Sequence, residues 1–194
     1  MIKRLALFSR IMLALGALLL IPLAPSIASA KSIADDPRLE RLFEELKTAE
    51  SPLEADRLSG QIDEIWRSAK GETAELLLSR ADDAIGNKDY SLAIDVLDQL
   101  IAMEPEFAEA WNRRATVFYL SDDYGRSLAD IAVTLALEPR HYGALTGLGL
   151  ILEELGEDKK AYEALHRSIT LNPYQDNVKK ELETLETSAI GQTV

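Results

Sequence analysis

Cysteine is absent from the 194-residue chain, and this absence excludes disulfides, thiolate metal sites and cysteine nucleophiles. It also removes the residue that carries the lipid of a bacterial lipoprotein. Histidine is scarce too. The two histidines, His141 and His166, have no histidine or carboxylate partner at the spacing of a helical H-E-x-x-H metal site. We therefore expect no bound metal, and a surface or interface role for both imidazoles.

Basic residues are in the minority, with 21 Lys and Arg against 33 Asp and Glu and a net charge of −12. A protein that binds phosphate backbones needs a positive surface, so nucleic acid is not expected as a partner. The acidic balance fits either a surface charge that keeps the protein soluble or a surface that receives a basic partner. The 47% of hydrophobic residues predicts a packed globular body rather than disorder.

Known catalytic patterns are also missing. The two glycines within residues 147–149 lack the third glycine of a phosphate-binding loop and lie inside an expected helix. The acidic residues within 153–158 do not follow the spacing of a calcium-binding loop, and spacing suggests no Ser/His/Asp grouping. We expect no catalytic residues, no cofactor and no enzymatic activity. An enzyme with an unrecognised site is the alternative.

Residues 1–30 have the layout of a secretory signal peptide. A basic start, an almost unbroken apolar run and a small-residue cleavage pattern follow one another: Lys3, Arg4 and Arg10, then Ile11 to Ile21, then Ala28, Ser29 and Ala30. Cleavage after Ala30 would leave 164 residues with a net charge of −15, and a periplasmic or secreted protein. The alternative is an uncleaved segment that anchors the chain in the inner membrane through residues 11–27. No other membrane contact is expected.

A motif that recurs every 34 residues dominates the rest of the chain. Its central copy, residues 108–141, carries Trp111, Ala115, Tyr124 and Pro139. The copy before it has Leu77, Ala81, Tyr90 and Pro105 in the same places, and the copy after it has Leu145, Gly149, Asp158 and Pro173. An aromatic residue or Leu, then a small residue, Tyr and Pro at this period resemble the tetratricopeptide repeat (TPR) family. The resemblance covers residues 74–175.

This resemblance implies an all-α fold, a right-handed α-solenoid of three helix pairs at 74–107, 108–141 and 142–175. The small residue in each first helix lets the two helices of a pair approach closely, and each proline ends a second helix. Residues 31–73 are expected to form an N-terminal helical hairpin, and residues 176–194 a C-terminal capping helix and tail. The hairpin is expected to pack on the first repeat, because the end of a repeat array otherwise exposes apolar surface.

Helix-start signals place the two helices of the hairpin. Asp36 precedes a proline suited to the first helical position, and Ser51 with Glu54 forms a capping box. Apolar residues then recur at helical spacing in both segments. The capping helix is expected from Asp176 to Ser188, with residues 189–194 frayed.

The resemblance further implies a partner-binding groove. In this family the first helices of successive repeats line a concave face, and contacts fall at repeat positions 2, 5, 9, 12 and 13. Repeat one contributes Glu75, Leu78, Asp82, Ile85 and Gly86, repeat two Glu109, Asn112, Thr116, Tyr119 and Leu120, and repeat three Gly143, Thr146, Leu150, Glu153 and Glu154. This lining is apolar in the middle and acidic at its edges. It suits an extended or helical segment with apolar anchors and a Lys or Arg.

Some family members grip the C-terminal carboxylate of a peptide with Lys and Asn on this face. The equivalent first-repeat positions here are Leu78 and Asp82, and the acidic residue would repel a carboxylate, so a grip of that kind is not expected. We expect a non-catalytic adaptor or scaffold of the bacterial cell envelope with a protein or peptide partner in the groove. The alternative is a structural or assembly subunit of a membrane-associated envelope complex.

Gly143 and Gly147 lie one turn apart on or beside the expected groove face. Glycine inside a helix costs about 1 kcal/mol relative to alanine. Either these glycines let the backbone of a partner come close, or they are tolerated in a helix held by its neighbours. The first reading predicts that Gly143→Leu weakens partner binding without changing the thermal transition.

Overall fold

The computed structural model describes residues 33–191, and their side chains as far as Thr187. All regular structure within these residues is helical, without a strand. The predicted signal peptide, residues 1–30, lies outside the described residues. Within the described part of the chain, no helix combines the length and the apolar composition needed to cross a membrane.

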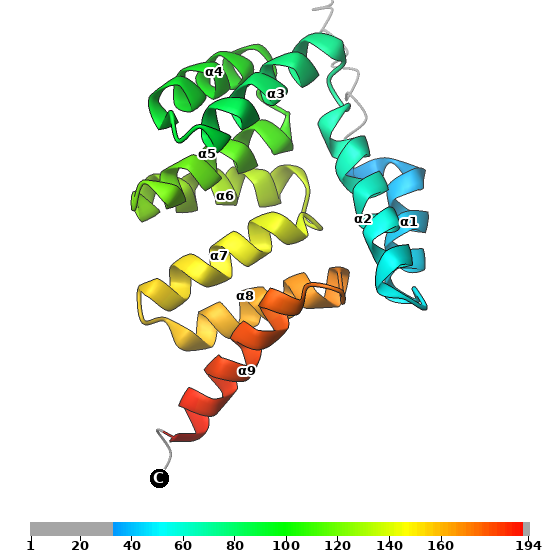
Figure 1. Cartoon of the computed structure of the whole chain (residues 1–194), viewed down its shortest axis with the longest axis vertical. Coiled ribbons are helices and arrows are strands. Elements are labelled where there is room, and N and C mark those ends of the chain that lie inside the picture. Colours follow the sequence, from blue (N-terminus) through cyan, green and yellow to red (C-terminus); the bar gives the residue numbers. More distant parts are fainter. Residues whose placement is uncertain (1–32, 192–194) are drawn as a thin grey trace, which may run out of the picture. The chain divides into compact units, whose positions relative to one another are not determined.

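Three helix pairs follow one another as the 34-residue period predicts. They are α3 (Glu72–Gly86) with α4 (Tyr90–Met103), α5 (Ala108–Leu120) with α6 (Tyr124–Leu137), and α7 (Tyr142–Glu154) with α8 (Asp158–Leu171). Each pair packs on the next, α4 against α5 and α6 against α7 (Figure 1). The expected all-α solenoid of three helix pairs is confirmed.

One residue with a left-handed backbone sets the turn inside each pair. Lys88, Asp122 and Gly156 have φ angles of 60°, 57° and 73°, and they occupy the same place in the three repeats. Only the third is glycine, the residue that adopts this conformation without strain. In the first two repeats, the carboxylates of Asp89 and Asp123 then each accept a 3.1 Å hydrogen bond from the backbone N–H three residues on. Turn and cap together fix where each of these second helices begins.

Small residues bring the two helices of a pair into contact. In repeat two, the Ser127 hydroxyl donates a 2.8 Å hydrogen bond to the backbone carbonyl of Ala115. In repeat three, a Cβ atom added to Gly149 would lie 2.5 Å from the Leu165 side chain. Both distances require that the first helix present little or no side chain at this point, as the small residues predict.

Gly149→Ala is expected to destabilise the protein. The added Cβ would overlap Leu165, which is fully buried, and overpacking of this kind costs about 1–3 kcal/mol. Gly147→Ala is the matched control, because its Cβ would lie 3.6 Å from Ile131, an ordinary contact. There the better helix propensity of alanine should stabilise by up to about 1 kcal/mol. Urea denaturation followed by circular dichroism checks both variants, and equal changes would contradict the close approach.

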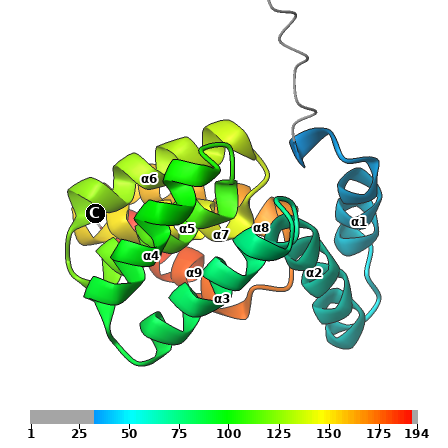
Figure 2. The ribbon, with the colours of Figure 1, turned by 90° about the horizontal axis from the view of Figure 1, so that it is seen from above.

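The N-terminal hairpin begins with a short 3-10 turn and continues with two helices: Ile33–Asp35, α1 (Pro37–Lys47) and α2 (Pro52–Arg67). Figure 2 shows α1 and α2 as a pair of their own. Asp36 and Ser51 cap the two helices with side-chain oxygens that accept backbone N–H groups, as predicted. The Glu54 carboxylate reaches back as in a capping box, but it accepts the N–H of Glu50 at 3.0 Å rather than that of Ser51.

The expectation that this hairpin covers the first repeat is wrong for most of its length. Its apolar core includes Tyr142, at the start of α7, and packs against Leu171 and Tyr174 beyond the first repeat. At its end, Ala69 packs against the core of repeat one. Leu76 on α3 is 71% exposed, so the edge of the first repeat is not covered at this point. The hairpin instead buries Phe43 and Trp66 against the rings of His141 and Tyr142, and aromatic contacts of this kind add to the stabilisation from buried area.

Arg140 and His141, in the loop between repeats two and three, hold the hairpin in this position. The Arg140 guanidinium donates to the Ala34 carbonyl at 2.7 Å and to the Glu40 carboxylate at 3.1 Å. His141 is buried, and its ring stacks on that of Trp66 in α2 with centroids 4.4 Å apart. The adjacent loop residues therefore contact both helices of the hairpin, Arg140 through hydrogen bonds near and on α1 and His141 through ring stacking on α2.

The last helix, α9 (Asp176–Gly191), continues three residues beyond the predicted end at Ser188. Residues 189–191, expected to fray, are therefore helical, and the rest of the predicted tail lies outside the described residues. Val178 and Leu185 are buried in one cluster with Leu165 of α8. The helix thus covers apolar surface of the third repeat.

Candidate functional site

The groove expected along the first helices is hollow between α5 and α7, where a cavity of about 270 Å³ lies. Helix α5 lines it with Asn112, Ala115, Thr116, Tyr119 and Leu120, α6 with Ser127 and Ile131, and α7 with Gly143, Ala144, Thr146, Gly147 and Leu150. We call this cavity the α5–α7 groove. It is built from repeats two and three alone.

Seven of the predicted groove residues meet in this cavity: Asn112, Thr116, Tyr119, Leu120, Gly143, Thr146 and Leu150. Sequence reasoning missed the floor, to which Ser127 and Ile131 of α6 contribute. The family contact positions used for the prediction all lie in first helices, so they cannot identify side chains of second helices. The available signal was the small size of Ala115 and Gly147, which lets residues of α6 border the cavity.

The wall of the α5–α7 groove is mainly apolar because its hydroxyl groups are bonded within the protein. Thr116 Oγ1 donates to a backbone carbonyl one turn earlier at 3.0 Å, and the Ser127 hydroxyl donates to the backbone of α5. Thr146 Oγ1 lies 2.8 Å from a serine hydroxyl of α8. Leu120 adds a large apolar side chain that is 44% exposed. A pocket of this composition favours an apolar side chain as its occupant.

The end of the groove formed by the last turns of α5 and α7 is acidic. Glu153, in the last turn of α7, does not line the cavity, and Glu181 of α9 is its neighbour. Burial, the contact with Glu181 and the charges of further carboxylates raise the pKa of Glu153 to about 7. Tyr119 lines the cavity near these groups, and its ring stacks on Tyr124 with centroids 5.9 Å apart. Burial and the neighbouring carboxylates raise the pKa of Tyr119 as well.

Repeat one does not contribute to the α5–α7 groove, contrary to expectation. Leu78 is fully buried in the core of its own helix pair, so it has no surface to offer a partner. Asp82 accepts hydrogen bonds from two guanidinium groups, Arg67 of α2 at 2.7 Å and Arg113 of α5 at 2.9 Å. The unpaired acidic charge expected at Asp82 is therefore balanced by ion pairs. The other predicted residues outside the cavity are half-buried Glu75 and Ile85 and exposed Gly86 and Glu154.

Glu109 is also absent from the groove, because it is buried in a chain of polar contacts. It is 5% exposed, and its carboxylate accepts from Arg113 at 2.9 Å and from His141 Nε2 at 2.9 Å. His141 Nδ1 accepts the backbone N–H of Ala144 at 3.1 Å, so the hydrogen-bond geometry places the ring proton on Nε2. Burial by itself would raise the pKa of Glu109. The hydrogen bond from His141 and the charge of Arg113 outweigh burial and lower the pKa to about 2.

Protonation of Glu109 should destabilise the fold. The pKa of Glu109 is about 2 in the folded protein against an ordinary 4.5. The contribution of its charge to the free energy of unfolding is therefore complete above pH 4.5 and is lost as the pH falls towards 2. This shift corresponds to about 3 kcal/mol. At pH 6, the free energy of unfolding measured by urea denaturation should be lower for Glu109→Gln than for the unchanged protein. Between pH 5 and pH 3, it should fall by less in the variant than in the unchanged protein. Parallel pH curves for the two proteins would contradict the role of the charge.

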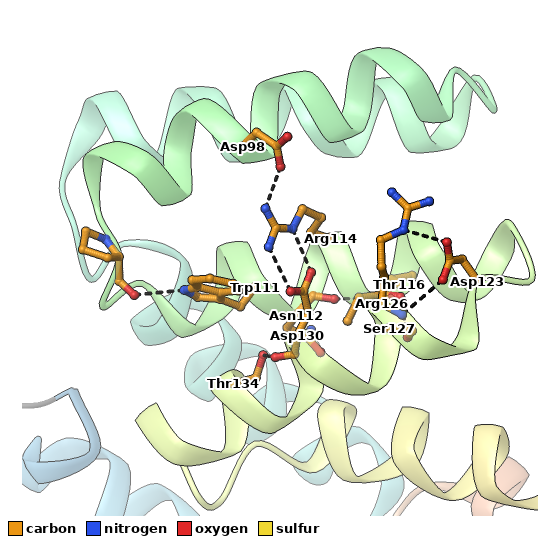
Figure 3. A network of polar contacts seen from close by, with 12 residues as sticks. Asp98, Trp111, Asn112, Arg114, Thr116, Asp123, Arg126, Ser127, Asp130 and Thr134 are labelled. Atoms are coloured by element: carbon orange, nitrogen blue, oxygen red, sulfur yellow. Dashed lines mark hydrogen bonds and ion pairs between the residues drawn. The ribbon is translucent and has the colours of Figure 1, made fainter.

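A second polar network fixes α5 between its neighbours (Figure 3). The Arg114 guanidinium donates to Asp98 on α4 at 2.6 Å and to both carboxylate oxygens of Asp130 on α6 at 2.8 and 2.9 Å. These hydrogen bonds, foremost those that Arg114 donates to Asp130, raise the pKa of Arg114. The same guanidinium lies 4.8 Å from the ring of Trp111, whose Nε1 donates to the carbonyl of Pro105. Sequence reasoning missed this network, because the repeat pattern does not mark Arg114.

Other candidate sites in the described part of the chain are less well defined. His166 is exposed on α8, and its ring stacks on Tyr162 at a centroid distance of 5.8 Å. A hollow on the N-terminal hairpin carries mixed charges: Arg38, Arg41 and Arg57 with Asp56 and Glu64. Among the described residues, no set of His, Asp and Glu side chains is grouped as the ligands of a metal ion would be.

Comparisons of the sequence with known proteins agree with this architecture. Residues 78–134 match the family model described as tetratricopeptide repeat. A TPR repeat-containing protein of Rhizobium etli is 36% identical over 154 residues, which cover 79% of this chain and 76% of the relative. A heat-shock protein cognate co-chaperone of Aspergillus fumigatus is 27% identical over 113 residues. This second match covers 57% of the chain but only 33% of the co-chaperone.

Solved structures show the same fold. The first TPR of Spaghetti (RPAP3), bound to an HSP90 peptide, superposes with a TM-score of 0.58 at 18% identity and covers 60% of this chain and 93% of that one. The MamA RS-1 double mutant superposes with a TM-score of 0.54 at 20% identity and covers 78% and 83% of the two chains. At such low identity, the similarity shows a shared arrangement of helices and does not show a shared ligand.

Proposed function

This chain belongs to the tetratricopeptide repeat family, and we propose that it is a non-catalytic adaptor that holds a segment of a partner protein in the α5–α7 groove. The observation that carries this proposal is an open, mainly apolar cavity between two first helices, in which the threonine and serine hydroxyl groups are bonded internally. None of its lining residues carries a carboxylate, an imidazole or an amine. Such a cavity binds an apolar side chain by removing two apolar surfaces from water.

The two glycines of α7 support a partner whose backbone approaches closely. Gly143 is exposed and lines the cavity, and Gly147, one turn on, lines it next to the buried side chain of Ile131 on α6. With no side chain on this stripe of α7, an extended strand or a helix can lie against the helix backbone while one of its side chains fills the groove.

A peptide is also the ligand in the structural relative that was solved with an HSP90 peptide. We propose a different recognition chemistry for this chain. Leu78 is fully buried, and Asp82 is held by Arg67 and Arg113, so neither position is available to grip a terminal carboxylate. The partner would be recognised through internal side chains instead.

We further propose that the adaptor works in the bacterial cell envelope. The support is the sequence of residues 1–30, with its basic start, apolar run and small residues at the end. When a bacterium expresses the full-length chain, a processed protein that begins with Lys31 should be recovered from its periplasm, as N-terminal sequencing would show. Recovery from the membrane fraction with residues 1–30 still attached would favour the anchored alternative.

Photo-crosslinking tests the groove directly. A p-benzoylphenylalanine at Leu120, which lines the groove, should form an adduct with a partner protein in cells. The same group at Leu53, which is 81% exposed on α2, serves as control and should not. An adduct with a second copy of the chain would favour a structural subunit over an adaptor.

Gly143→Leu should remove most of the Leu120 adduct, about tenfold or more, and leave the thermal transition unchanged. Gly125→Leu is the matched control, because Gly125 is likewise the second residue of its helix, follows a tyrosine and is exposed. It does not line the groove, so the adduct should persist there. A full adduct in Gly143→Leu would contradict binding in the groove.

A further inference from the structure

We propose that the α5–α7 groove holds an extended peptide segment by its backbone. The carboxamide of Asn112 pairs with the N–H and C=O of one residue of this segment, while one of the segment's side chains fills the apolar cavity. The inference rests on the proposed function and decides between the two kinds of segment, an extended strand or a helix, that the groove could receive. It also identifies what is recognised besides the apolar side chain, which is a neutral peptide group.

The side chain of Asn112 is buried without a hydrogen-bond partner. The residue is 8% exposed, and its carboxamide forms no hydrogen bond with any other described residue. Asn172, the other buried asparagine of the described residues, accepts the N–H of Tyr174 at 3.1 Å. Buried polar side chains are nearly always hydrogen-bonded in folded proteins, and one that lacks a partner lowers stability. The unpaired carboxamide of Asn112 therefore points to a partner outside the fold.

A ligand in the groove can reach this carboxamide, because Asn112 lines the cavity. Among the described residues, the side-chain nitrogen or oxygen atom that is fully enclosed and lacks a partner is Trp66 Nε1. The unpaired atoms of Asn112 are not enclosed in this way, so they remain accessible. The threonine and serine hydroxyls of the lining are bonded within the protein. Asn112 thus places an available donor and an available acceptor in a mainly apolar wall.

A peptide group in an extended segment matches the carboxamide. The carboxamide has an NH₂ donor and a C=O acceptor, and an extended residue presents its N–H and C=O together, as in paired strands. In a helix, these backbone groups are already bonded to each other, so a helical segment would leave Asn112 unpaired. A terminal carboxylate needs a cation as its partner, and none of the lining residues is a lysine, an arginine or a histidine. The occupant is therefore an extended, internal segment.

The opposite wall of the groove leaves room for a backbone near Asn112. Asn112 follows Glu109 by one turn on α5, and Gly143 follows His141 closely at the start of α7. The Glu109 carboxylate and His141 Nε2 lie 2.9 Å apart, so Asn112 and Gly143 line the same end of the groove. Gly143 is exposed and has no side chain. The backbone of a partner can therefore pass between the carboxamide and the backbone of α7.

Selection from a random dodecapeptide phage library supplies the probes that test the inference. Protein purified from cells expressing the full-length chain is the bait, and the selected peptides are synthesised with fluorescein and measured by fluorescence anisotropy. Peptides whose affinity falls about tenfold or more with Gly143→Leu, but not with Gly125→Leu, define groove binders.

Asn112→Ala should weaken the groove binders by about tenfold, because their hydrogen bonds to the carboxamide are lost. The urea midpoint of this variant should stay the same or rise, since an unpaired polar group is removed and alanine is a better helix former. Asn177→Ala is the matched control, because Asn177 is exposed on α9 and does not line the groove. It should change neither quantity. A lower urea midpoint in Asn112→Ala would give the carboxamide a structural role and overturn the inference.

Replacement of single peptide bonds of a groove binder by esters tests the backbone pairing itself. An ester keeps the shape of the chain and removes one N–H donor. At one position it should weaken binding to the unchanged protein by about fivefold or more, and binding to Asn112→Ala by less than about twofold. Esters with equal effects on both proteins, or groove binders with undiminished affinity for Asn112→Ala, would overturn the inference and leave the proposed function intact. Selection that gives no peptide sensitive to Gly143→Leu would overturn the proposed function as well.

Discussion

Each repeat depends on the direct contact of its two helices at one small residue of the first helix. In repeat two this residue is Ala115, whose carbonyl accepts the hydroxyl of Ser127, and in repeat three it is Gly149, which touches Leu165. Because α6 comes this close to α5, its side chains reach the space between α5 and α7 and form the floor of the groove. The site therefore follows from the same contact that makes a helix pair, and a bulky residue at this point would damage both.

Two adjacent arginines connect α5 to three neighbouring helices, Arg113 to α3 and Arg114 to α4 and α6. Arg113 bonds Asp82 and Glu109, while Arg114 bonds Asp98 and Asp130. The Arg114–Asp130 pair is largely buried, with side chains 17% and 6% exposed. Replacing one of these two residues would leave an uncompensated charge, so the pair favours one position of the helix even where its net stabilisation is small. Since α5 provides one wall of the groove, its fixed position keeps the cavity open without a bound partner.

The parts of the fold that repeat could be predicted from the sequence. Proline ends a helix and a small residue permits a close contact through local sterics, so their 34-residue spacing predicted three helix pairs. The resemblance to the TPR family then predicted seven residues of the α5–α7 lining. The docking of the N-terminal hairpin could not be predicted, because it depends on single contacts such as that of Glu40 with Arg140, 100 residues away. The burial of Leu78 and Glu109 could not be predicted for the same reason, because it too depends on contacts with neighbouring elements. Family positions give the side of a helix, but neighbouring elements decide which residues on that side remain exposed.

The docked hairpin also constrains the order in which the chain can reach its final structure. Helices α1 and α2 are made early, yet their partners Tyr142 and Tyr174 both belong to repeat three, Tyr174 in the loop after α8. A chain that emerges from the ribosome with its amino end first therefore leaves Phe43 and Trp66 uncovered until nearly the whole sequence has appeared. Local helix pairs can assemble one by one, but the hairpin closes last, through contacts of long sequence separation that form slowly.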